Sequence, residues 1–173
     1  ESVKLQTKLP DEIIVADDGS DKTTKDCVDD FSKSSSLKLI YSWQQDYGFR
    51  VAESRNKAIS KSICDYIILI DGDVILHNKF IEDHLSHAEF GFFVQGTRVF
   101  LDRTTSSSLL KNGVRLFSFF SKGLSNRKNA IYSIFFAKLF VTKKNHIVGI
   151  KTCNLAFYRK DCVEINGFNN DMV

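Results

Sequence analysis

The chain has 173 residues, of which 43% are hydrophobic and 26% are charged. This length and apolar content fit one globular domain with a buried core, and they exclude a disordered chain. No stretch approaches the roughly 18 uncharged apolar residues that a membrane-spanning helix needs. The net charge is only +3 and no nucleic-acid-binding motif is found, so we expect no nucleic-acid partner.

The four cysteines are expected to be free thiols. Cys27, Cys64, Cys153 and Cys162 form no Cys-x-x-Cys pair, and most of them lie far apart along the chain. This arrangement favours buried thiols in a reducing compartment over disulfide bonds or a metal site.

The first half of the chain alternates short apolar segments with helical ones. Strands are predicted over residues 12–16, 37–43 and 66–70, because each segment is short, apolar and rich in β-branched or aromatic residues. One predicted helix begins near Asp21, and two others cover residues 51–63 and 79–87. This alternation is typical of α/β proteins, so the expected fold is a mostly parallel central sheet flanked by helices.

A pair of carboxylates at a predicted strand end lies close to the start of the chain. Asp17 and Asp18 follow the strand predicted over residues 12–16, so two carboxylates are expected at its carboxyl end. Arg55 and Asn56 lie in the first turns of the helix predicted over residues 51–63, where the helix dipole and these side chains favour an anion. The alternative for the acidic pair is an Asp-Gly turn that caps the following helix.

The segment from Asp65 to Asp73 is the most informative part of the sequence. Residues 66–70 are all apolar and are followed by Asp71, Gly72 and Asp73, and such a run predicts a strand buried on both faces. Carboxylates two positions apart point to the same side, and open α/β sheets bind ligands at this end of their strands. A hard divalent cation would offset their repulsion. The alternative is an ordinary turn after a buried strand.

The second half of the chain is strongly basic. Between Arg103 and Lys160 the chain has twelve Lys and Arg and no Asp or Glu, so the remainder has 12 basic and 21 acidic residues, a balance of −9. Residues 104–145 contain apolar clusters spaced by Lys and Arg, which predicts a pair of amphipathic basic helices inserted in the domain. These helices either cap the sheet or lie on anionic lipid. Further strands are expected within residues 92–101 and 152–158.

Several short segments of the sequence, taken in chain order, resemble the motifs of a known family. The segments are Ile13-Ile14-Val15-Ala16-Asp17-Asp18-Gly19-Ser20, Gly48-Phe49-Arg50 with Arg55-Asn56-Lys57, Ile70-Asp71-Gly72-Asp73, Cys153-Asn154-Leu155-Ala156-Phe157 and Ile165-Asn166-Gly167-Phe168-Asn169. Together they resemble the family 2 glycosyltransferases of the GT-A fold, and the last two are similar to the galactosyltransferase-type C-terminal part of that family. The resemblance covers the chain apart from residues 104–145. It implies one partial, Rossmann-like GT-A domain over residues 1–173.

The resemblance implies roles for the nucleotide-binding residues. In this family the first acidic pair meets the base and the ribose, which implies these roles for Asp17 and Asp18. Carboxylates can accept hydrogen bonds from a uracil N–H or from ribose hydroxyls. Arg55 is similar in position to the family's arginine that approaches the nucleotide, and its guanidinium suits a phosphate or a base edge. The alternative for Arg55 is a surface ion pair.

The family's DxD motif matches Asp71 and Asp73. By this resemblance Asp73 would bind Mn²⁺ or Mg²⁺ directly, while Asp71 would contact the ribose or a metal-bound water. The metal would bridge the diphosphate and neutralise charge on the departing nucleotide. Asn154, Asn166 and Gly167 would lie beside the acceptor.

The implied reaction is inverting transfer of a sugar from a nucleotide donor, with UDP expected, to an acceptor hydroxyl. The acceptor would be a glycan or lipid-linked glycan in bacterial cell-surface polysaccharide or lipopolysaccharide synthesis. The enzyme would lie on the cytoplasmic side of the membrane, with residues 104–145 as a peripheral contact with its anionic inner face. The family's general base follows the Asn-Gly-Phe turn, so we expect it beyond Val173. The family's first strand would precede residue 1, and we therefore expect a fragment truncated at both ends.

Other classes fit less well. A non-catalytic module that binds a nucleotide sugar or an anionic glycan stays open, because the expected base lies outside the chain. Haloacid dehalogenase-type phosphatases have a DxD motif on their first strand, whereas Asp71 follows two earlier strands. Sugar nucleotidyltransferases would need a Gly-rich basic phosphate loop near the start, which is not seen here.

Overall fold

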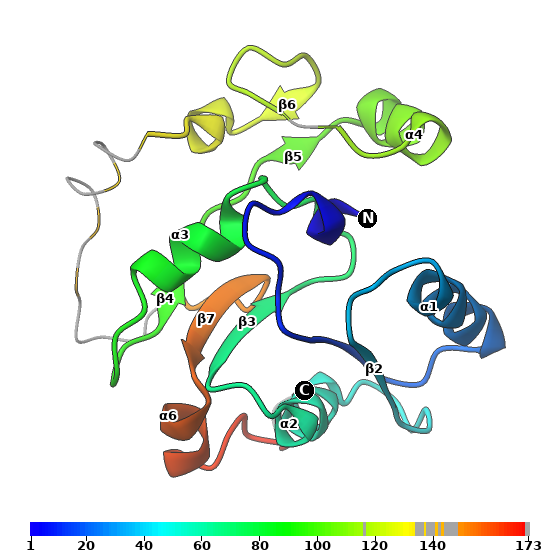
Figure 1. Ribbon diagram of the computed structural model, residues 1–173, viewed down its shortest axis with the longest axis vertical. Helices are drawn as coiled ribbons and strands as arrows, with labels where there is room; N and C mark the ends of the chain where they lie inside the picture. Colours follow the sequence, from blue (N-terminus) through cyan, green and yellow to red (C-terminus); the bar gives the residue numbers. More distant parts are fainter. Residues whose placement is uncertain (116, 134–136, 138–140, 142, 144–148, 172–173) are drawn as a thin grey trace.

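The computed structural model describes residues 1–171 except 116, 134–136, 138–140, 142 and 144–148. Its helices and strands are η1 (Ser2–Leu5), β1 (Ile13–Asp17), α1 (Lys22–Lys33), β2 (Leu39–Trp43), α2 (Val51–Lys61), β3 (Tyr66–Ile70), α3 (Phe80–Ser86), β4 (Val94–Gln95), β5 (Phe100–Leu101), α4 (Arg103–Asn112), β6 (Leu124–Ser125), η2 (Arg127–Ala130), β7 (Asn154–Tyr158) and α6 (Arg159–Glu164). Figure 1 shows β3 and β7 side by side in the centre, with β5, β6 and α4 together at the upper end.

The first sheet consists of β1 and β2, which run parallel with Asp17 opposite Trp43. Helix α2 packs against both strands. Glu12, just before β1, joins the sheet to the end of α2, because its carboxylate accepts hydrogen bonds from Ser62 Oγ at 2.6 Å and from the Ile63 N–H at 3.0 Å. The predicted strands and helix of this region are confirmed, with small shifts at their ends.

The second sheet has β7 in the middle, antiparallel to β3 on one side and to β4 on the other. Its apolar side chains form the core of the molecule. Leu155 and Phe157 of β7 are buried with Ile59 of α2 and Cys162 of α6. Burying such side chains is worth roughly 1.5–3 kcal/mol each, so this cluster joins α2, β7 and α6.

The α/β class is confirmed, but the expected mostly parallel central sheet is wrong for the described part of the chain. There the parallel pairing is that of β1 with β2, and β3 pairs antiparallel with β7. The apolar run of β3 predicts burial, but it does not specify the direction of a neighbouring strand. One consequence matters below: because β3 and β4 both run antiparallel to β7, their carboxyl ends meet at the same edge.

The basic part of the chain also departs from expectation. Helix α4 begins after Asp102, whose carboxylate accepts a hydrogen bond from the Thr105 N–H at 2.8 Å, and it ends at Gly113, where φ is +83°. Residues 117–120 therefore lie outside any helix, and the helix predicted over the 116–120 cluster is wrong there. Strand β6 instead pairs with β5. The second predicted helix, over residues 134–140, lies mostly outside the described residues.

The four cysteines are free, as predicted. Cys153 and Cys162 are buried, whereas Cys27 is exposed, so burial is confirmed for some of the thiols and wrong for Cys27. Within the described ranges, no helix has the length and apolar character that crossing a membrane requires.

Candidate functional site

Asp17 ends β1 and is almost fully buried, with 5% of its surface exposed. Its carboxylate accepts hydrogen bonds from the Ser20 N–H at 2.8 Å, from the Gly19 N–H at 3.1 Å and from the Tyr41 hydroxyl. Burial alone would raise the pKa of Asp17, but these hydrogen bonds outweigh it, and the pKa lies below its ordinary value. Burial and the same carboxylate raise the pKa of Tyr41 to about 12. Asp17 is therefore an ionised side chain fixed at the strand end.

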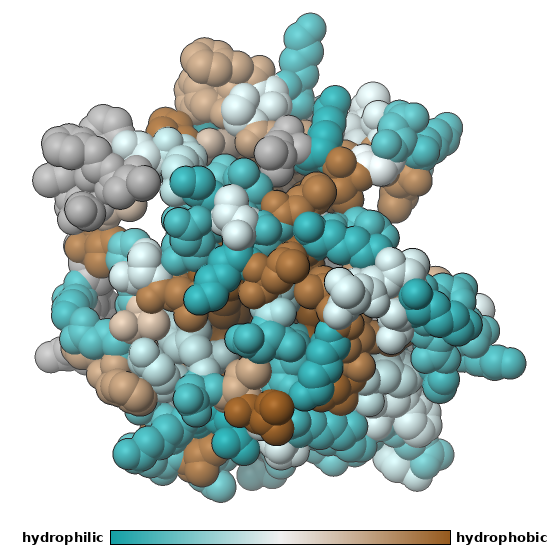
Figure 2. All heavy atoms as spheres, viewed as in Figure 1, coloured by the Kyte–Doolittle hydropathy of each residue, from teal (hydrophilic) through white to brown (hydrophobic). Residues whose placement is uncertain are grey.

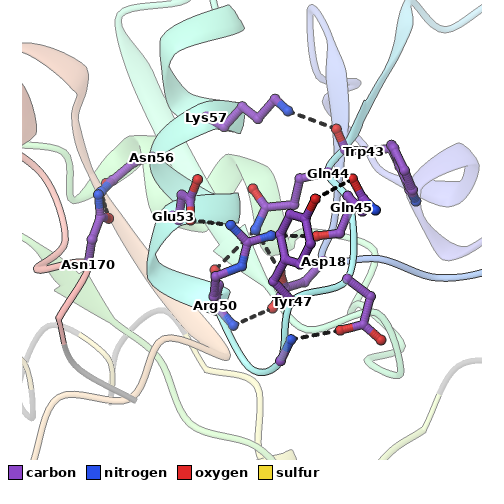
Figure 3. A network of polar contacts seen from close by, with 12 residues as sticks. Asp18, Trp43, Gln44, Gln45, Tyr47, Arg50, Glu53, Asn56, Lys57 and Asn170 are labelled. Atoms are coloured by element: carbon purple, nitrogen blue, oxygen red, sulfur yellow. Dashed lines mark hydrogen bonds and ion pairs between the residues drawn. The ribbon is translucent and has the colours of Figure 1, made fainter.

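Asp18 connects this strand end to the loop before α2. Its carboxylate accepts a hydrogen bond from Gln44 Nε2 at 2.6 Å and another from the Arg50 N–H at 2.7 Å. Figure 3 shows both contacts, with the Arg50 side chain beside Glu53 and Tyr47. The Arg50–Glu53 ion pair measures 2.7 Å. The loop that enters α2 is thus positioned directly by the acidic end of β1.

Helix α2 then joins this strand end to the one after β3. Its amino end contacts Asp18, and one and a half turns later Arg55 faces Asp71, with Nη2 and Oδ1 3.9 Å apart. The Asp71 side chain is 42% exposed and that of Arg55 25% exposed. The structure thus places both Asp18 and Asp71 in contact with residues of α2 or of its amino-terminal cap.

Arg98 also lies beside Asp71, although the sequence did not single it out. It lies in the connection from β4 to β5, and its Nη1 is 3.9 Å from Asp71 Oδ2. Its guanidinium lies over the Phe100 ring, 5.0 Å from the centroid. In sequence Arg98 is one of seven arginines, and it lies just before the basic part of the chain. Only its position just beyond a short strand could have suggested that it lies at a strand end.

Asn154 lies at the same sheet edge, opposite Ile70 in the register of β3 and β7. Its Oδ1 is 2.8 Å from His84 Nε2 of α3, and its Nδ2 donates to the Thr97 carbonyl at 3.2 Å. The Gly96 N–H donates to the Asn154 carbonyl at 3.0 Å. A Cβ at Gly96 would collide with the Asn154 side chain, so the close approach requires glycine. Asn154 thereby connects three elements around the edge.

The Asn-Gly-Phe turn is attached to α2 through Asn56. The Asn56 amide donates to the Phe168 carbonyl at 2.8 Å and accepts from the Phe168 N–H at 2.9 Å. Asn166 and Gly167 both have left-handed backbone conformations, with φ of +63° and +72°. The sequence placed Asn56 where an anion would bind, but its amide is used in this docking contact. A cavity of about 700 Å³ lies beside the turn, lined by Asn56, Asn166 and Gly167 among others.

Comparison with known proteins identifies the family of the chain. The family described as "Glycosyl transferase family 2" matches residues 1–164. The chain belongs to glycosyltransferase family 2. Membership of this family agrees with the motif order and implies the GT-A fold, although the described residues form small sheets.

Individual relatives cover smaller parts of the chain. It is 31% identical over 83 residues to validoxylamine A glucosyltransferase of Streptomyces hygroscopicus subsp. limoneus, a match covering 47% of this chain and 18% of that protein. It is 27% identical over 84 residues to the chondroitin synthase of Pasteurella multocida, covering 49% and 8%. The Escherichia coli chondroitin synthase is 30% identical over 74 residues, covering 43% and 10%. The matched stretch is less than one fifth of the length of each of these relatives.

Family 2 enzymes typically use a divalent metal, so the strand-end carboxylates can be tested for fit. Among the described residues, no three or more His, Cys, Asp or Glu come together as a metal cluster. Mg²⁺ is usually bound by one or two carboxylates, with water and substrate phosphates as the other ligands, and Mn²⁺ accepts the same oxygen ligands. Asp73 is exposed, and its side chain makes no hydrogen bond or ion pair with another described residue. Asp71 and Asp73 follow the same strand, and their carboxylate oxygens are donors of the type that such an ion accepts.

Proposed function

We propose that this chain forms the donor-binding part of a metal-dependent, inverting glycosyltransferase that uses a nucleotide sugar, with UDP as the nucleotide. The observation that supports this most directly is the arrangement around α2. Its amino end contacts Asp18 after β1, and its Arg55 faces Asp71 after β3. A nucleotide lying along this helix would meet carboxylates at one end and a guanidinium at the other.

The base and the ribose would lie at Asp17 and Asp18. A carboxylate can accept about four hydrogen bonds. Asp17 already accepts three in the folded chain and Asp18 accepts two. Asp18 therefore has more capacity left for ribose hydroxyls, while Asp17, ionised and fixed, suits a single N–H donor.

Asp71 and Asp73 would bind Mn²⁺ or Mg²⁺, with Asp73 as the direct ligand. When bound, such an ion neutralises the charge that develops on the departing diphosphate. Asp71 is partnered by Arg55, whose guanidinium lies 3.9 Å from its carboxylate at the same edge. Asp73, exposed and without a described partner, is the carboxylate that can turn toward an ion.

The acceptor would be a glycan or lipid-linked glycan of a bacterial cell-surface polysaccharide. The two relatives named as chondroitin synthases support a polysaccharide product, and Asn166 and Gly167 beside the 700 Å³ cavity support an acceptor position near α6. The Asn154 amide contacts His84 and Thr97, so its part on the acceptor side would be to position the edge. The general base would come from residues beyond Val173.

We also propose that the basic part contacts the anionic inner face of a membrane from the cytoplasmic side. Leu110 is 91% exposed and is followed in the sequence by Lys111. Phe120 is 85% exposed and lies two residues before Lys122. Figure 2 shows hydrophobic atoms beside hydrophilic ones at the upper end of the molecule, over α4 and β6. Exposed apolar side chains among cations favour an anionic lipid surface.

Calorimetry of UDP binding tests the central proposal. The complete protein is titrated with UDP in Mn²⁺ and in EDTA, alongside Asp73→Ala and Asp26→Ala, an exposed aspartate of α1 that serves as the control. We expect binding that needs both the metal and Asp73 and that Asp26→Ala leaves unchanged. Binding that is indifferent to metal and to Asp73 would contradict the proposal. If the protein binds UDP but an activity assay detects no release of UDP from any UDP-sugar, a non-catalytic module is favoured.

A further inference from the structure

We propose that Arg98 binds the diphosphate of the donor together with Arg55. This inference rests on the proposed function, because it assigns a new residue to the same donor site. It follows from one juxtaposition. Two arginines from different elements, Arg55 of α2 and Arg98 of the β4–β5 connection, converge on the single carboxylate of Asp71.

The topology of the second sheet produces this convergence. Strands β3 and β4 are both antiparallel to β7, so both end at the edge where β7 begins. Asp71 follows β3 directly, and Arg98 follows β4 by three residues. Arg55 approaches the same edge from α2. Arg98 and Arg55 therefore contact different oxygens of Asp71, with Arg98 nearest Oδ2 and Arg55 nearest Oδ1.

Neither arginine is used up by Asp71. Both pairs measure 3.9 Å, whereas charge-assisted hydrogen bonds between nitrogen and oxygen are about 2.7–2.9 Å long. Each guanidinium has five N–H donors, and those of Arg98 are accessible because its side chain is 43% exposed. Two cations share the single carboxylate of Asp71, so Asp71 alone does not balance both of them. A ligand with several anionic oxygens, such as a diphosphate, could accept hydrogen bonds from both guanidiniums at once.

Each arginine is also oriented by an aromatic ring. The guanidinium of Arg98 lies 5.0 Å from the centroid of Phe100, and that of Arg55 lies 5.8 Å from the centroid of Phe168. Contacts of this kind restrict the side chain while leaving the N–H edge free. A side chain that is oriented before binding loses less entropy when the ligand arrives.

The backbone of Arg98 is fixed on both sides. Asn129 Nδ2 donates to the Arg98 carbonyl at 2.9 Å, and the Asn154 amide donates to the preceding Thr97 carbonyl at 3.2 Å. Gly96 packs against Asn154 with no room for a side chain. Arg98 is thus a residue on an anchored connection, in contrast to Arg103 of α4, whose side chain makes no hydrogen bond, ion pair or ring contact with another described residue.

The test compares UDP with uridine, which lacks the phosphates. UDP binding is measured by calorimetry in Mn²⁺, and uridine binding by NMR titration, for the complete protein, Arg98→Gln, Arg98→Lys and the control Arg103→Gln. We expect Arg98→Gln to weaken UDP binding about 10- to 100-fold and to leave uridine binding unchanged. The UDP affinity of Arg98→Lys should lie between those of the wild type and Arg98→Gln, because lysine keeps the charge but lacks the planar guanidinium. Arg103→Gln should bind UDP like the wild type.

The outcomes separate this inference from the proposed function. If the wild type binds none of UDP, GDP and ADP, the proposed function fails and the role of Arg98 fails with it. If the wild type binds UDP and Arg98→Gln binds it equally well, only the role of Arg98 is overturned. Equal weakening of UDP and uridine would also overturn it, because Arg98 would then serve the nucleoside or the fold. Thermal unfolding of each variant checks that the exposed substitution leaves the fold intact.

Discussion

The acidic strand ends and the basic part of the chain both concentrate charge, but they fix it to different extents. Asp17, Asp18 and Asp71 each have defined partners from another element. In the basic part, the side chains of Lys111 and Lys122 make no hydrogen bond or ion pair with another described residue. The comparison teaches that charge density indicates a partner, whereas fixed geometry indicates a chemical site. Substitutions at the strand ends should therefore act strongly and singly, and those in the basic part weakly and additively.

Beyond Asp73→Ala, the largest effect is expected for Asp71→Asn. This change removes the charge between Arg55 and Arg98 and one carboxylate of the proposed metal pair. We expect UDP binding in Mn²⁺ to weaken about 100-fold, since changes at metal-ligating groups and their partners cost 10- to 100-fold or more. Asp65→Asn, at the opposite end of β3 and exposed, is the matched control. Equal behaviour of the two variants in calorimetry would remove Asp71 from the site.

Asn56 provides a second test, because it joins α2 to the Asn-Gly-Phe turn rather than binding an anion. Asn56→Ala removes the two hydrogen bonds to the Phe168 backbone and leaves these groups unpaired. We expect the free energy of unfolding to fall by about 2 kcal/mol in urea denaturation. Asn112→Ala, at the exposed end of α4, is the control. Unchanged stability with weakened UDP binding would instead favour the anion-binding interpretation of Asn56.

Glu12 tests whether the first sheet depends on a fixed charge. Burial would raise its pKa, but hydrogen bonds from Ser62, Lys38 and Ile63 lower the pKa to about 2. A pKa lowered by folding contributes stability above the unfolded pKa, and this stability is lost as the pH falls through the folded pKa.

Glu12→Gln should therefore cost about 2 kcal/mol in the free energy of unfolding near neutral pH. The difference from the wild type should shrink as the pH falls from about 4.5 toward 2. Thermal unfolding across this range measures it, with Asp11→Asn as the control on an exposed neighbour. A difference that does not change with pH would show that packing, not charge, is responsible.

The smallest effects are expected in the basic part. Lys111→Glu should lower retention on anionic vesicles at low salt by a factor of about 5 per lysine replaced, with no change in UDP binding, since each lysine near such a surface contributes about 1 kcal/mol. Lys22→Glu, the same charge change on α1, is the control. Retention that responds equally to both variants would mean that net charge, and not this surface, mediates binding.

The sequence by itself determined the local elements and the acidic strand ends. The runs that became β1, β2 and β3, the helix after Arg50 and the position of Asp71 all follow from apolar periodicity and turn residues, which act over a few neighbours. Gly113 shows how one residue can end a helix before an apolar cluster that otherwise looked helical. Family membership was predictable for the same reason, because its motifs are short and local.

Only the tertiary structure decided how these elements meet. The antiparallel pairing of β3 with β7 joins segments more than 80 residues apart, and no local pattern specifies the direction of such a pairing. That pairing brings the ends of β3 and β4 to one edge and places Arg98 beside Asp71. The docking of Phe168 on Asn56 is likewise a long-range contact. The sequence missed Arg98 because its place beside Asp71 depends on the closure of long loops, which nearby residues cannot encode.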